Sequence, residues 1–185
     1  MSLPLEREIK LRFDNPEAAR AAVRAAGALP LKPRRLQSDV LLDTEQRTLS
    51  ARSQVLRVRI EDGQSFVTFK SPTAHPTLKV REELETGVEN GQRLVAILAQ
   101  AGFDIWFRYE KYREEFSFDE AVIAVDETPV GTFIEIEGSD RGIAAAALAL
   151  GRGPADYLLD SYRTLFVRFC EERGLPATHM VFAAG

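Results

Sequence analysis

The sequence is poor in the residues that carry most thiolate and imidazole chemistry. Cys170 is the only cysteine in 185 residues, which excludes an internal disulfide and a metal cluster held by several thiolates. The two histidines, His75 and His179, have no partners at the spacing of metal ligands, so we expect both to be incidental. A metal ion bound by this chain would therefore be held by oxygen atoms.

Long apolar runs and a large excess of one charge are also missing. No segment approaches the length of a membrane span, and the charged N-terminal residues Glu6, Arg7, Glu8 and Lys10 are unlike a signal peptide. With 24 basic and 28 acidic side chains, the net charge of −4 argues against a broad surface for nucleic acid or membranes. We expect a cytoplasmic protein that binds a polyanion only locally, where basic residues converge.

Familiar nucleotide-binding loops are absent as well. No glycine precedes Lys-Ser or Lys-Thr, and Gly151-Arg152-Gly153 follows an expected helix, whereas a dinucleotide-binding fingerprint follows a strand. No repeat or linker divides the chain, and its length and 45% apolar content suit one well-buried core. Residues 1–185 are therefore predicted to form a single domain.

The hydrophobic periodicity predicts an α+β protein. Capping residues and terminal glycines predict helices over about 15–27, 90–102, 140–151 and 160–174. Alternating patterns predict strands over 3–13, 37–43, 55–61, 65–70, 78–86, 106–119, 122–126 and 132–137, with a hairpin turn at Asp62-Gly63. These elements indicate a mostly antiparallel eight-stranded sheet, closed into a barrel or strongly curled, with helices packed outside.

One face of nearly every predicted strand is charged, because alternate residues of a strand share a face. A charged sheet face that is exposed to solvent is the simpler interpretation. Two observations argue against it: acidic and basic residues are separated along the chain, and closure of the sheet would turn the charged faces toward one another. Clustered carboxylates need a cation, and clustered arginines and lysines need an anion. A polyphosphate bound to Mg²⁺ or Mn²⁺ would satisfy both groups. The acidic group is Glu6, Glu8, Asp126, Glu135 and Glu137, and the basic group is Arg57, Arg59, Lys70, Lys111 and Arg113.

The motifs that carry these residues resemble those of the CYTH family, also called triphosphate tunnel metalloenzymes. Glu6-Arg7-Glu8-Ile9-Lys10 is similar to the ExExK signature of that family, which is weak alone. The resemblance continues in order through most of the chain, in segments 56–59, 68–70, 108–113, 126–137 and 161–162. It implies an eight-stranded antiparallel tunnel and an enzyme of the group that includes class IV adenylyl cyclases, thiamine triphosphatases and inorganic triphosphatases.

The resemblance also implies roles for individual residues. It assigns metal binding to Glu6, Glu8, Glu135 and Glu137, with Asp126 as a further ligand, and the triphosphate clamp to Arg57, Arg59, Lys70, Lys111 and Arg113. Lys10 would lie beside the reacting phosphate and orient or deprotonate the attacking water. Glu83 and Glu85 match acidic positions used by some members, with a structural role equally expected, and Ser161-Tyr162 would pack at one tunnel end.

Three functions stay open at this point. Hydrolysis of inorganic triphosphate or of a small organic triphosphate such as thiamine triphosphate is preferred, because no purine pocket is evident; Phe66, Phe107 or Tyr109 could stack on a base but are expected in the core. The alternatives are adenylyl cyclase chemistry on ATP and a non-catalytic polyphosphate-binding module. The apolar tail, residues 175–185, could cap a tunnel mouth, form a homodimer interface or be poorly ordered.

Overall fold

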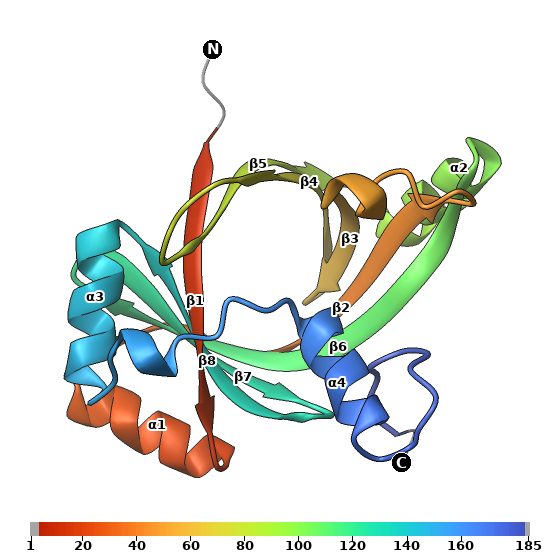
Figure 1. Ribbon diagram of the computed structural model, residues 1–185. Helices are drawn as coiled ribbons and strands as arrows, with labels where there is room; N and C mark the ends of the chain where they lie inside the picture. The colour runs from red at the N-terminus through yellow and green to blue at the C-terminus, as the bar shows by residue number, and fades with distance from the viewer. Residues whose placement is uncertain (1–3, 184–185) are drawn as a thin grey trace.

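The alternating segments form a closed barrel (Figure 1). In the computed structural model, which describes residues 4–183, eight strands follow one another around the barrel in the order β1-β5-β4-β3-β2-β6-β7-β8, and every neighbouring pair is antiparallel. The predicted fold class is confirmed. The strands are β1 (Leu5–Phe13), β2 (Leu29–Thr44), β3 (Val55–Glu61), β4 (Gln64–Thr73), β5 (Lys79–Val88), β6 (Phe103–Phe118), β7 (Ala121–Thr128) and β8 (Gly131–Gly138).

Four α-helices accompany the barrel in the described part of the chain, each starting at a polar cap. Asn15 accepts a hydrogen bond from the backbone N–H of Ala18, and Asn90, Ser139 and Ser161 do the same for their helices. None of the described helices has the length and apolarity needed to cross a membrane. The helices are α1 (Pro16–Ala25), α2 (Gly91–Gln100), α3 (Asp140–Ala149) and α4 (Tyr162–Glu171), with short 3-10 turns η1 (Ser50–Arg52) and η2 (Pro154–Asp156).

β2 is much longer than the sequence pattern predicted, starting at Leu29 instead of Gln37. Pro30 and Pro33 hide its first half, since proline cannot donate to a strand ladder. The structure accommodates both prolines at irregularities, because the pairing of β2 with β6 shifts between Pro30 and Lys32 and again between Lys32 and Arg35. The predicted start of the first strand at residue 3 lies outside the described residues.

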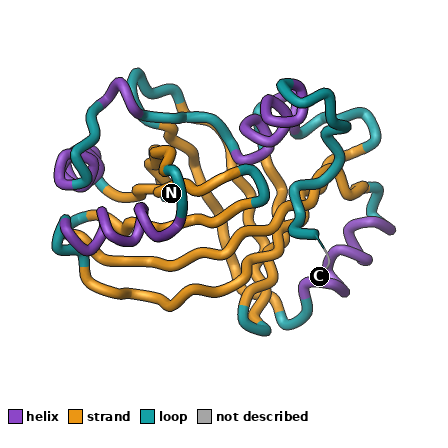
Figure 2. The backbone as a smooth tube through the Cα atoms, turned by 90° about the horizontal axis from the view of Figure 1, so that it is seen from below, coloured by secondary structure: helices purple, strands orange, loops and turns teal. Residues whose placement is uncertain are grey.

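Two apolar clusters flank the barrel wall. Outward-facing Ile9 and Ile134 pack with Val23 of α1 and Ile143 of α3 in the larger cluster. The smaller cluster lies at one end of the barrel, where Phe166 of α4 meets inward-facing side chains, including Phe107. Figure 2 shows the helices around the periphery of the strands. One end of the barrel is therefore partly covered by α4, and polar residues fill the remaining interior.

The C-terminal tail packs against this same end. Met180 is 0% exposed and belongs to the smaller cluster. Its carbonyl accepts a hydrogen bond from the N–H of Glu110 (2.8 Å), and its N–H donates to the carbonyl of Arg108 (3.0 Å). The tail thus adds a short parallel bridge to β6 within the same chain. Its last two residues lie outside the described part.

Candidate functional site

The predicted charged faces point into the barrel and line one cavity of about 710 Å³. Barrel closure is the cause, because a strand that packs its apolar face against outer helices must turn its alternate residues inward. Asp126 is fully buried beneath Lys111, Arg113 and Tyr162 and does not line the cavity. The cavity brings together all of the other predicted residues: Glu6, Glu8, Lys10, Arg57, Arg59, Lys70, Glu83, Glu85, Lys111, Arg113, Glu135 and Glu137.

Lys10 lies at the centre of the acidic wall formed by β1 and β8. The register places Lys10 opposite Glu135, and Glu8 opposite Glu137. The Lys10 ammonium lies 3.0 Å from a carboxylate oxygen of Glu8 and 3.0 Å from one of Glu135. Burial would lower the pKa of Lys10, but these carboxylates outweigh it and raise the pKa above its ordinary value. Lys10 therefore carries a proton and can donate hydrogen bonds.

The negative charge of two other carboxylates on this wall, Glu6 and Glu137, is less well balanced by nearby lysines. Glu6 accepts a hydrogen bond from Lys70 at 2.6 Å, yet burial and the Glu8 carboxylate raise its pKa. Although the Glu137 side chain is exposed, partial desolvation by surrounding atoms, followed by repulsion from Glu6 and Glu135, raises its pKa to about 7. The wall therefore has an excess of negative charge that a cation would relieve.

The acidic wall suits a hard divalent cation by its chemistry, since it offers only carboxylate oxygens. Within residues 4–183, no three carboxylate, imidazole or thiol groups converge closely enough to coordinate an ion as they stand. The lysines explain this: Lys10, Lys70 and Lys79 each contact one or more of the carboxylates. An incoming metal ion would displace ammonium groups from carboxylates already gathered on one wall.

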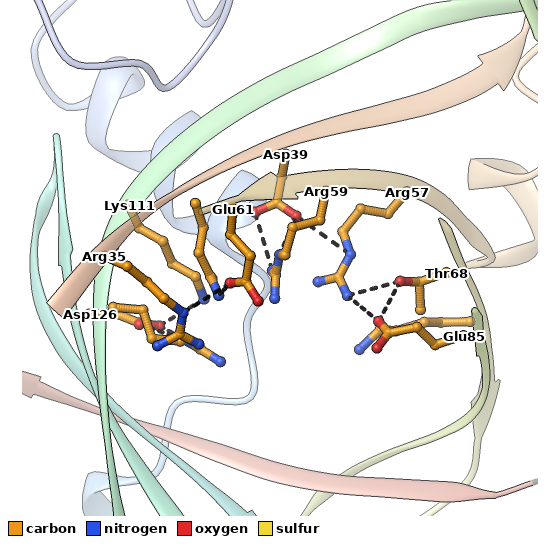
Figure 3. A network of polar contacts seen from close by, with 12 residues as sticks. Arg35, Asp39, Arg57, Arg59, Glu61, Thr68, Glu85, Lys111 and Asp126 are labelled. Atoms are coloured by element: carbon orange, nitrogen blue, oxygen red, sulfur yellow. Dashed lines mark hydrogen bonds and ion pairs between the residues drawn. The ribbon is translucent and has the colours of Figure 1, made fainter. Parts of the chain in front are cut away.

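The basic wall lies on β3 and β6. Arg59 donates to the two oxygens of Asp39 (2.9 and 3.2 Å), and the Arg57 Nε lies 3.5 Å from the same carboxylate (Figure 3). Arg57 also donates to Thr68 at 3.0 Å, and its ion pair with Glu85 spans 3.4 Å. The guanidinium groups are therefore fixed from behind and from the side, with their charge directed into the cavity.

Lys111 and Arg113 are held together by Asp126. The Asp126 carboxylate accepts hydrogen bonds from Lys111 (2.9 Å), from Arg113 (2.7 and 2.6 Å) and from the Tyr162 hydroxyl (2.5 Å). Burial would raise its pKa, but Arg113 and Lys111 outweigh this and lower it. Burial, followed by repulsion from Arg113, lowers the pKa of Lys111 to about 8. In this arrangement the Asp126 oxygens are occupied by basic and hydroxyl donors, and Arg113 links Asp126 to Glu135 of the acidic wall, to which it donates at 2.8 Å.

The sequence of this chain was compared with those of known protein families. The model of the CYTH domain matches residues 4–149. The chain belongs to the CYTH family. A curated protein of Methanocaldococcus jannaschii, named "Putative adenylate cyclase", is 29% identical over 136 residues, which cover 73% of this chain and 77% of that protein.

Solved structures share the fold of this CYTH protein. A protein of Vibrio parahaemolyticus, described as "a putative adenylate cyclase", has a TM-score of 0.77 and 22% identity, over 90% of this chain and 99% of that one. A Hippeastrum protein, described as a "putative adenylyl cyclase" with a dominant triphosphatase activity, has a TM-score of 0.60 and 22% identity, over 92% of this chain and 89% of that one.

Sequence reasoning assigned no chemical role to several polar residues in or next to the cavity of this CYTH protein, among them Asp39, Lys79 and Tyr162. Asp39 is 1% exposed and holds both β3 arginines, and Lys79 contacts Glu8. Burial lowers the pKa of Lys79 to about 8 even though Glu8 opposes the shift. The Tyr162 hydroxyl contacts Asp126, although the sequence predicted mainly a packing role for this residue. Asp39 and Lys79 could have been found, since each lies in step with other polar residues of its strand.

The structure also shows the contacts of Glu83, Glu85 and Phe107, whose roles the sequence left open. Glu83 and Glu85 each contact a clamp residue, Lys70 at 3.1 Å and Arg57 at 3.4 Å. Phe107 is 2% exposed and packs against Phe166, with ring centroids 5.7 Å apart, so it belongs to the core. The two glutamates therefore balance basic charge beside the cavity, and Phe107 is closed to a ligand.

Proposed function

We propose that this CYTH protein is a divalent-metal-dependent triphosphatase that hydrolyses inorganic triphosphate or a small organic triphosphate such as thiamine triphosphate. The observation that carries the proposal is the single cavity in which a carboxylate wall on β1 and β8 meets basic side chains from β3, β4 and β6. Its volume of about 710 Å³ lies within the range of small-molecule sites. Phosphoryl transfer needs mainly positioning and charge stabilisation, which this arrangement supplies.

The basic wall would bind the phosphate chain. Arg57 and Arg59 present guanidinium forks that suit phosphate oxygens, and their contacts with Asp39 and Thr68 reduce the freedom lost on binding. The ammonium groups of Lys70, Lys111 and Lys10 would add positive charge along the chain. We assign the Lys10 ammonium, which contacts Glu8 and Glu135, to orienting the terminal phosphate and the water.

The acidic wall would bind Mg²⁺ or Mn²⁺ through Glu6, Glu8, Glu135 and Glu137. A metal ion bound there would neutralise negative charge on the phosphates and activate a water molecule. The carboxylates would hold the metal, and the basic clamp would hold the phosphate chain. Asp126 would act through Arg113 and Lys111, keeping both side chains turned toward the phosphates.

Adenylyl cyclase chemistry is the second candidate, favoured by the names of the Methanocaldococcus and Vibrio proteins. The same clamp could present the α-phosphorus of ATP to the ribose hydroxyl. The activity described for the Hippeastrum protein supports hydrolysis as a reaction that this fold can carry. A binding module without turnover would not need the buried Lys10 between Glu8 and Glu135.

Product analysis separates these reactions. Purified protein with Mg²⁺ or Mn²⁺ is given tripolyphosphate, thiamine triphosphate and ATP in turn, and phosphate, pyrophosphate and cyclic AMP are resolved. We expect phosphate from a triphosphate without cyclic AMP from ATP. Cyclic AMP with equal pyrophosphate would replace the triphosphatase with a cyclase, and absence of turnover with every substrate would leave the binding module.

Site variants test the two walls. We expect Glu6→Gln and Arg59→Gln to lower kcat/KM at least about a hundredfold, since each removes charge that stabilises the reacting phosphates. Arg108→Gln is the matched control, because Arg108 is exposed on the outer face of β6. Circular dichroism verifies folding. Near-normal turnover by folded Glu6→Gln or Arg59→Gln protein would refute the assignment.

A further inference from the structure

The cavity continues beyond the phosphate clamp to a mouth beside α4. There its lining changes from lysine, arginine and glutamate to Leu41, Gln54, Val55, Trp106 and Arg163. A phosphate chain has no need of aliphatic and indole surfaces. These residues suit a planar organic group, since small-molecule sites combine apolar walls with a few polar groups that fix orientation.

A β-bulge places Trp106 at this mouth. In the pairing of β2 with β6, Leu41 lies opposite Phe107 and Leu42 opposite Ile105, so Trp106 is an extra residue without a partner. Bulges redirect side chains and occur frequently beside active sites. Without this insertion, alternation would turn the side chain next to inward-facing Phe107 away from the barrel. Instead, Trp106 is half-buried and lines the cavity.

Arg163 makes a cation–π contact with the indole of Trp106. It comes from the first turn of α4, and its guanidinium carbon lies 4.2 Å from the centroid of the Trp106 ring. Within residues 4–183, no carboxylate lies within salt-bridge distance of Arg163, although most cavity cations have one. The mouth therefore carries positive charge beside an aromatic surface.

We propose, on the basis of the triphosphatase function proposed above, that the mouth formed by Trp106, Arg163, Val55 and Gln54 binds the uncharged heteroaromatic base of a nucleoside triphosphate. Bases stack on indole rings and on guanidinium planes. The positive charge of Arg163 disfavours thiamine triphosphate, whose thiazolium ring is itself a cation. Inorganic triphosphate would fill only the clamp. Among organic triphosphates, nucleoside triphosphates should therefore bind more tightly than thiamine triphosphate.

The fluorescence of Trp106 tests binding directly, because it is the only tryptophan in the chain. Protein with Mg²⁺ is titrated with a non-hydrolysable ATP analogue, with thiamine triphosphate and with tripolyphosphate, using excitation where adenine does not absorb. We expect saturable quenching by the ATP analogue at concentrations well below those needed for thiamine triphosphate. Tripolyphosphate should change the signal little. Equal responses to the ATP analogue and tripolyphosphate would overturn the subsite.

Kinetics supply the second readout. Trp106→Leu should lower kcat/KM for ATP at least about fivefold, mainly through KM, because stacking on an aromatic side chain is lost. Tripolyphosphate turnover should stay within about twofold of the wild type, since the clamp is unchanged. Trp106→Phe keeps an aromatic face and is expected to retain most of the ATP preference. An unchanged ratio of ATP to tripolyphosphate turnover in Trp106→Leu would refute the proposal.

The two proposals can fail separately. Turnover of tripolyphosphate without a fluorescence response to the ATP analogue would keep the triphosphatase and reject the base subsite. A saturable response to the ATP analogue, without turnover of any triphosphate, would reject the triphosphatase and support the subsite as a nucleotide-binding site.

Discussion

Asp39 contacts both arginines of β3 from a position almost closed to solvent. Burial alone would raise the pKa of this carboxyl, but Arg59 and Arg57 outweigh burial and lower it. The inward position of Asp39 could be predicted from the alternation Gln37, Asp39, Leu41. Its pairing could not, because the sequence does not give the register that places Asp39 opposite Arg59 on the neighbouring strand β3. Single-residue roles in the site therefore depend on how the strands are aligned.

Asp39→Asn tests this positioning role. The amide keeps the size of the side chain but loses the charge that fixes Arg57 and Arg59. We expect KM for triphosphate to rise about tenfold with a smaller change in kcat, since misplaced guanidinium groups mainly weaken phosphate binding. Steady-state kinetics provide the check, and Ser38→Ala, one residue away on β2, is the control. An unchanged KM would refute the role.

The pH dependence of stability follows from the same carboxyl. Because its pKa is lower in the folded protein than the usual value of 3.8, its ionised form stabilises the fold above pH 3.8. This stabilisation is lost as the pH falls through the folded pKa. The free energy of unfolding should therefore decrease less on acidification in Asp39→Asn than in the wild type. Urea unfolding at a series of acidic pH values would show the difference; parallel curves would contradict it.

The helices and strands differ in how well the sequence predicts them. Asn15 and Asn90 were predicted as helix caps and are confirmed, whereas α3 and α4 are capped by Ser139 and Ser161, each one residue from the predicted starts at 140 and 160. The first half of β2 was missed because its prolines resemble a loop and only the partner strand β6 makes it a strand. The bulge at Trp106 was missed for the same reason, since it exists only in the pairing of two distant strands.

The tail is an element whose contribution can be measured. Met180 is fully buried against the aromatic residues of α4 and β6. Met180→Ala should lower the free energy of unfolding by about 2–5 kcal/mol, the cost of a core cavity. Leu175→Ala is the control, because Leu175 is 52% exposed, and its effect should stay within about 0.5 kcal/mol. Chemical denaturation measures both, and equal effects would contradict the packing of the tail.

The barrel as a whole holds many charges that compensate one another. From the sequence, the separation of acidic and basic strands predicted a site for a metal and a polyanion, and the structure brings both groups to one cavity. The sequence could not predict that lysines contact the acidic wall, because ExExK motifs do not reveal which ammonium reaches across to Glu6 or Glu8.

Ligand binding should therefore stabilise the entire molecule. Tripolyphosphate with Mg²⁺ at about a hundred times its Kd should add about 2.7 kcal/mol, because only the folded barrel gathers the site. For a chain of this length we expect a rise in Tm of about 5–10 °C. Differential scanning calorimetry with Mg²⁺ alone as the reference provides the measurement. A Tm that does not respond to tripolyphosphate would contradict a preassembled clamp.

Closure joins β1 to β8, so Leu5–Phe13 cannot complete its hydrogen bonds until residues 131–138 are present. During synthesis the first strand leaves the ribosome long before its partner, with one edge and an apolar face uncovered. Such distant pairing slows folding and favours association between incomplete chains. The signature motif of the site lies on this strand. Newly made protein should therefore acquire its acidic wall last, and chains interrupted before β8 should aggregate without ever forming it.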